Sequence, residues 1–112
     1  MSLNRYDDSE SKVYFAIRAP RRRSLIEHLS RGAPRSKSEL AKEIAADVYN
    51  MEIKSLTNND YRNVYTSLEQ THLPCLIDAD IVTCGPRNEK ISPGPNYEFA
   101  RQLVNVTEDM SP

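Results

Sequence analysis

The chain has 112 residues, of which 38% are hydrophobic and 28% are charged, and its formal net charge is −1. This length fits one domain, and the composition excludes a disordered chain and a uniformly basic DNA-coating protein. No stretch approaches the roughly 18 apolar residues of a membrane span, and no charged-then-apolar leader opens the sequence. We therefore expect a cytoplasmic protein that does not contact a membrane.

The residues that usually carry catalysis or bind metals are sparse and poorly spaced. Cys75 and Cys84 sit in apolar stretches, where reduced core thiols are expected rather than a disulfide. His28 and His72 are not spaced as metal ligands. With three glycines in the chain, no glycine-rich phosphate loop is present. We expect no metal, no cofactor and no enzymatic activity.

The sequence divides into two short tails and one domain. We predict flexible tails at residues 1–10 and 108–112 and a domain over residues 11–107. A short apolar turn at Val13–Ile17 ends before Pro20, which suits the first position of a helix. That helix presents an apolar face, and Gly32 is expected to end it.

Two capped amphipathic helices follow. Ser36 and Glu39 have the spacing of a capping box, and the apolar residues beyond them repeat with a helical period. Thr57 is placed to cap a second helix together with Asp60. The link from about Tyr49 to Thr57 has no clear period and is longer than a tight turn, so its role stays open.

The second of these helices has an apolar stripe that runs from Tyr61 to Leu68, and Pro74 should kink or restart it near His72. Ile81–Cys84 and Lys90–Ser92 then read as two strands joined by a turn. A last amphipathic helix is expected from about Asn96 to Val104. The predicted fold class is mainly α with a small β-hairpin, in the order of a winged helix-turn-helix (α+β).

This order predicts binding to double-stranded DNA. The helix at about 58–72 would enter the major groove, and the wing at about 81–92 would reach the adjacent backbone. Between Arg18 and Lys42 the chain has eight basic residues against two acidic ones, an excess that suits a polyanion. The candidate DNA-binding residues are Arg21, Arg22, Arg35, Lys37, Ser38, Arg62, Asn63, Thr66, Ser67, Gln70 and Arg87.

Three segments carry a resemblance to a known family. They are Ala19–Arg23, Ser38–Ala41 and above all Tyr61–Pro74, which contains the letters VYTSLEQTHLP. Together they resemble an uncharacterised winged-helix family common in halophilic archaea (DUF7344-like), over roughly residues 13–92. The resemblance implies a DNA-binding transcriptional regulator from an archaeon or an archaeal virus. The chain departs from the family pattern at Glu69, where tyrosine is frequent, at Asp80, where glycine is usual, and in its weaker acidity.

Two functions remain open from the sequence. The first is a sequence-specific DNA-binding regulator that forms a homodimer through its C-terminal helix. The second is a winged-helix module that binds another protein and makes no DNA contact. Glu69 on the reading face and a net charge near zero favour the second.

Overall fold

The computed structural model describes residues 10–109 of the chain. The tails expected at 1–10 and 108–112 lie outside this range, except for residues 10, 108 and 109, which are helical. The described part is mainly helical with a small antiparallel sheet, which confirms the predicted fold class.

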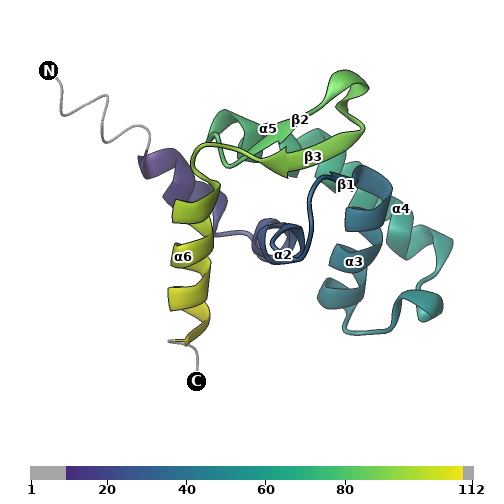
Figure 1. The fold of residues 1–112 in the computed structure, drawn as a ribbon. Helices are drawn as coiled ribbons and strands as arrows, with labels where there is room; N and C mark the ends of the chain where they lie inside the picture. Colours follow the sequence, from purple (N-terminus) through teal and green to yellow (C-terminus); the bar gives the residue numbers. More distant parts are fainter. Residues whose placement is uncertain (1–9, 110–112) are drawn as a thin grey trace, which may run out of the picture.

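A helical segment over residues 10–16 comes first (Figure 1). The elements that follow are α2 (Pro20–Leu29), β1 (Arg35–Ser36), α3 (Lys37–Tyr49), a 3-10 turn (Ile53–Ser55), α4 (Asn58–Ser67), a π-helical turn (Leu68–His72), α5 (Leu73–Asp78), β2 (Val82–Cys84), a second 3-10 turn (Pro86–Asn88), β3 (Lys90–Pro93) and α6 (Tyr97–Asp109).

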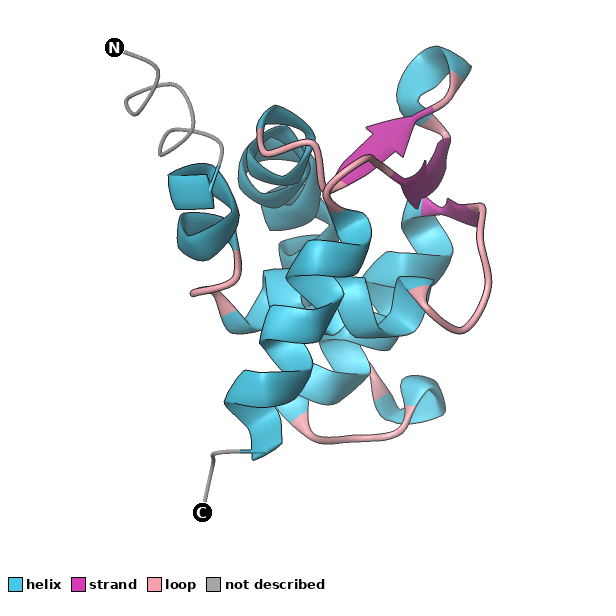
Figure 2. Ribbon diagram, turned by 60° about the vertical axis from the view of Figure 1, so that its left-hand side comes forward, coloured by secondary structure: helices cyan, strands magenta, loops and turns pink. Residues whose placement is uncertain are grey.

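The sheet has three strands in the order β1-β3-β2, and both pairings are antiparallel. Strands β2 and β3 are the predicted hairpin. Strand β1 comes from a segment that the sequence indicated only as an extended link, and Arg35 pairs there with Ile91. Figure 2 shows the strands together at one end of the helices.

Helix α2 lies at the centre of the fold, with α3 and α4 on one side and α6 on the other (Figure 1). Its residues Leu25 and Ile26 are fully buried in the core. The helix ends at Leu29, before the predicted Gly32, because the next residues continue into a turn in which the Gly32 N–H donates to the Leu29 carbonyl. Gly32 adopts no left-handed conformation, so the predicted end was wrong.

Polar contacts fix α2 against its two neighbours. On one side, the Nε2 of His28 lies 2.7 Å from Asp47 Oδ2 on α3, and the Ser24 hydroxyl donates to the same oxygen. On the other side, the buried hydroxyl of Tyr97 on α6 donates to the Ile26 carbonyl at 2.6 Å. These bonds set how the outer helices sit on α2.

Both predicted capping boxes are present. The N–H of Glu39 donates to Ser36 Oγ at 3.1 Å, and the N–H of Asp60 donates to Thr57 Oγ1 at 3.0 Å, with the reciprocal bonds also formed. Helix α3 ends at Tyr49, and the next residue, Asn50, caps it in a left-handed conformation with a φ of 54°. The beginnings of both helices, and the end of α3, are therefore fixed locally.

The helix that starts at α4 continues through a π-helical turn into α5, where the sequence predicted a kink or restart near His72. Pro74 has no N–H, and its ring would clash with the Gln70 carbonyl in a regular helix. A π turn inserts one residue and so relieves that clash. The chain thus restarts at Leu73 and keeps Leu73 and Leu76 buried.

The turn into the hairpin requires two special backbone positions. Asp80 has a φ of 58°, the left-handed conformation expected for the glycine that it replaces. Gly94 passes so close to it that an added Cβ would lie 2.6 Å from the Asp80 carbonyl oxygen. Because that oxygen belongs to the backbone, this contact could not be relieved by a side-chain rotation.

We predict that Gly94→Ala lowers the free energy of unfolding by about 1–3 kcal/mol, the cost of overpacking a tight contact. Gly32→Ala is the matched control, since nothing lies within 4 Å of its added Cβ. It should change stability by less than about 0.5 kcal/mol. Chemical denaturation followed by circular dichroism measures both, and equal effects of the two substitutions would contradict the steric explanation.

Candidate nucleic-acid interface

The polar face of α4 is exposed, as the sequence predicted. Arg62, Asn63 and Thr66 on α4, and Gln70 in the π turn, all reach solvent. None of the four has a hydrogen-bond or ion-pair partner of its side chain within residues 10–109. The opposite face of the helix packs into the core through Val64 and Leu68. Four free polar side chains thus line one side of a helix that is anchored on its other side.

Two lysines of α3 lie over two tyrosines of α4. The Nζ of Lys37 is 5.9 Å from the centre of the Tyr65 ring, and the Nζ of Lys42 is 6.0 Å from that of Tyr61. Burial raises the pKa of Tyr61, with a smaller contribution from Tyr65. These cation–π contacts hold two positive charges beside the polar face of α4. The sequence did not reveal Lys42 as a site residue, because the pairing of α3 with α4 is not visible in a one-dimensional pattern.

Carboxylates hold two of the predicted DNA-contacting cations. Arg35 forms an ion pair with Glu43, and its Nε lies 3.9 Å from Glu39. The Nζ of Lys37 lies 3.1 Å from Glu69 Oε2, on the π turn. In the structure, both cations are therefore neutralised by neighbours.

Arg21 and Ser67 bond to each other. The Arg21 guanidinium donates to Ser67 Oγ at 2.7 Å, and that hydroxyl donates to the Val64 carbonyl at 3.2 Å. Both side chains are partly buried. They join α2 to α4 and so position the polar face rather than extend it.

Arg22 is the predicted contact that the structure places inside the fold, with 7% of its surface exposed. Its Nε donates to the Ala16 carbonyl at 2.6 Å, and one terminal nitrogen lies 3.1 Å from His72 Nδ1. The guanidinium carbon also lies 5.4 Å from the centre of the Phe15 ring. Because these neighbours occupy its donors, Arg22 cannot bind a phosphate. The prediction that Arg22 contacts DNA was therefore wrong.

The hairpin brings further cations to the start of α3. Arg87 is exposed at the tip, with a φ of 63°, and Lys90 is exposed where β3 begins. Lys90 pairs with Ser36, the capping residue of α3, and Ser38 is exposed in the first turn of that helix. The tip of the hairpin, the start of α3 and helix α4 lie on the side of α2 away from α6 (Figure 1). Lys90 could not be recognised as a site residue from the sequence, because the pairing of β1 with β3 is not visible there.

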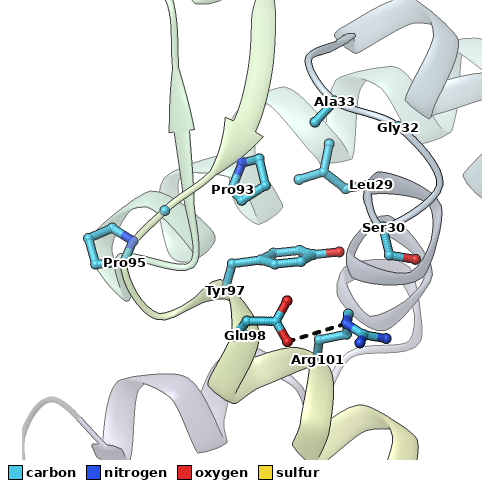
Figure 3. Close-up of a pocket in the computed structure, with 10 residues that line it drawn as sticks. Leu29, Ser30, Gly32, Ala33, Pro93, Pro95, Tyr97, Glu98 and Arg101 are labelled. Atoms are coloured by element: carbon cyan, nitrogen blue, oxygen red, sulfur yellow. Dashed lines mark ion pairs between the residues drawn. The ribbon is translucent and has the colours of Figure 1, made fainter.

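A hollow of about 530 Å³ lies away from this surface, between the end of α2, the end of β3 and the start of α6. Figure 3 shows Leu29, Pro93 and Tyr97 around it, with Glu98 and Arg101 paired at 3.6 Å. The hollow uses none of the predicted site residues.

Within residues 10–109, the structure contains neither a metal-binding cluster nor a membrane-spanning helix. Within the described range, no group of three or more histidine, cysteine or acidic residues could hold a metal ion. Cys75 and Cys84 are free thiols in partly buried positions. No described helix has the length and apolar character needed to cross a membrane.

Comparison with known proteins gives one match. A family model described as a domain of unknown function, DUF7344, matches residues 14–92. The matched range runs from the first helical segment to β3 and leaves out α6. No curated protein and no solved structure matches the chain.

We predict that His72 makes the fold sensitive to mild acid. Burial lowers the pKa of His72, and the nearby Arg22 lowers it further. The unfolded chain therefore binds a proton more readily than the folded one, so stability falls as pH falls below the ordinary value of 6.5. Denaturation at pH 7.5 and at pH 5.5 measures this loss. His72→Asn, whose amide oxygen accepts from Arg22 without titrating, should lose less stability over the same interval. An identical loss in both proteins would contradict the role of His72.

Proposed function

We propose that this chain, which belongs to the family of the domain of unknown function DUF7344, is a winged helix-turn-helix protein that binds double-stranded DNA and regulates transcription. The order helix, strand, two helices and a two-stranded hairpin supports the winged assignment. In this proposal α3 braces α4 across the backbone, α4 enters the major groove, and the hairpin is the wing. No catalytic step is part of the proposal.

The observation that carries the proposal is the unpartnered polar face of α4. A side chain without a partner in the unbound protein can bond to a base without breaking an internal contact, and Arg62, Asn63 and Gln70 are of this kind. Arginine donates two bonds to guanine, and asparagine or glutamine pairs with adenine. Lys42, Arg87 and Lys90 are exposed around this face and are suited to contact phosphates.

A protein-interaction module is the second candidate. The ion pairs of Arg35 with Glu43 and of Lys37 with Glu69 favour it, because they reduce the free positive charge at the surface. The two candidates differ in their response to salt. DNA binding driven by phosphate contacts weakens with a slope of about −0.9 in log K against log salt for each phosphate neutralised. If the protein bound no duplex even at low salt, the DNA-binding proposal would fail and the protein-interaction module would be favoured.

The proposed reading role of Arg62 gives a sharper test. A selection from random duplexes identifies the preferred sequence, and fluorescence anisotropy then measures affinity. We expect Arg62→Ala to weaken binding to that sequence by about 1–3 kcal/mol and to relax the preference at one position. Lys12→Ala is the matched control, since it removes one exposed positive charge from the first helical segment, outside both α4 and α6. Equal losses on every duplex would show that Arg62 contacts a phosphate instead.

We also propose that two copies associate through α6. Val106 on this helix is 54% exposed, and Tyr14, which is 46% exposed, packs edge-on against the Phe99 ring. Helices α6 and α4 lie on opposite sides of α2, so a dimer formed through α6 would leave both reading helices free (Figure 1). Sedimentation equilibrium gives the mass in solution, and a monomer at micromolar concentration would contradict the dimer. A cytoplasmic location and an archaeal or viral source stay predictions from the sequence.

A further inference from the structure

Glu69 places a negative charge on the surface that would face DNA. It lies in the π turn, one residue before Gln70, and its side chain is 50% exposed. Its Oε2 lies 3.1 Å from the Nζ of Lys37, whose own side chain is 13% exposed and lies over the Tyr65 ring. The ion pair therefore joins the first turn of α3 to the helix that carries the reading residues.

Glu69 differs from the other carboxylates near the interface. Glu39 is exposed, but its carboxylate is held in the capping box, where it accepts hydrogen bonds from the N–H and the hydroxyl of Ser36. Glu43 is largely buried beside Arg35 and His28. Glu69 has no second hydrogen-bond or ion-pair partner within residues 10–109, and half of its side chain reaches solvent. It is the carboxylate of these three that could exchange its partner when a duplex approaches.

We propose that Glu69 contributes to DNA sequence specificity by holding Lys37 away from phosphates until the preferred sequence is bound. This inference rests on the proposed DNA-binding function. In the free protein, the carboxylate neutralises Lys37 and repels phosphates, so binding to an arbitrary duplex is weakened. On the preferred sequence, Glu69 accepts a hydrogen bond from the exocyclic amine of a cytosine in the major groove. Lys37 is then released to a phosphate.

The chemistry of the groove supports the choice of base. A carboxylate only accepts hydrogen bonds, and among the groups that bases present in the major groove the cytosine amine is the donor that it pairs with most commonly. Opposite guanine or thymine the carboxylate would meet acceptors, and adenine places its N7 acceptor beside its amine, so each of these bases would leave the charge poorly compensated. After release, the contact with the Tyr65 ring still holds the Lys37 ammonium group beside α4.

The test compares wild type with Glu69→Gln on two kinds of duplex. On a mixed, non-selected duplex, the variant should bind more tightly, and its salt slope should steepen by about 0.9, the value for one more phosphate contact. In a selection from random duplexes, one position should shift from cytosine towards adenine, since glutamine pairs with adenine. Asp78→Asn is the matched control, because it breaks the exposed Lys12–Asp78 pair, which belongs neither to the reading face nor to α6, and should change neither result.

Lys37→Gln separates the exchange from simple repulsion. In that background, Glu69→Gln should give less of the gain on mixed duplex than it gives in the wild type. An equal gain in both backgrounds would overturn the exchange. Coincident melting curves for wild type and Glu69→Gln check that the fold is intact.

The two proposals fail in different ways. If wild type binds DNA and Glu69→Gln shows the same affinity, salt slope and selected bases, the role of Glu69 is overturned and DNA binding stands. If neither protein binds any duplex at low salt, the proposed function falls and this inference falls with it.

Discussion

The buried guanidinium of Arg22 is the contact on which the arrangement of the helices depends. A lysine could not replace Arg22, because two nitrogens of the guanidinium bond at once, one to the Ala16 carbonyl and one to the His72 ring nitrogen. One side chain thereby joins the first helical segment, the start of α2 and the π turn after α4. Taking a charge out of water is costly unless its donors are satisfied, and here the fold satisfies them. Helix α4 is thus held by its inner face and by its end, while its outer face is left free.

Much of the fold was predictable because its signals are local. The capping boxes at Ser36 and Thr57 can each be recognised from two residues three positions apart. Both helices begin where these residues indicated. The left-handed turn at Asp80 followed from the tolerance of aspartate for that conformation. Strand β1 was missed, since two residues carry no period of their own and the strand exists only through its pairing with β3.

The site was less predictable, because the sequence does not show which cations are already engaged. Arg21, Arg22 and Arg23 look equivalent in a run, yet Arg22 is buried and Arg23 donates to the carbonyls of Ile17 and Arg18. The pairing of Lys37 with Glu69 spans 32 residues, beyond any local rule. The exposed face of α4 was foreseen, since a helical period with one apolar stripe leaves the other side to solvent.

The π turn divides one continuous helix into two parts, α4 before it and α5 after it. Its additional residue shifts the angular phase of α5 relative to α4, so a helical wheel drawn straight from Asn58 to Asp78 would misplace the residues of α5. The exposed residues of the first part, α4, can be substituted without disturbing the core. The second part, α5, packs Leu73 and Leu76 into the core. Divergence among related chains would then concentrate on the outer side of the first part, and a new recognition code could evolve there at little cost to the scaffold.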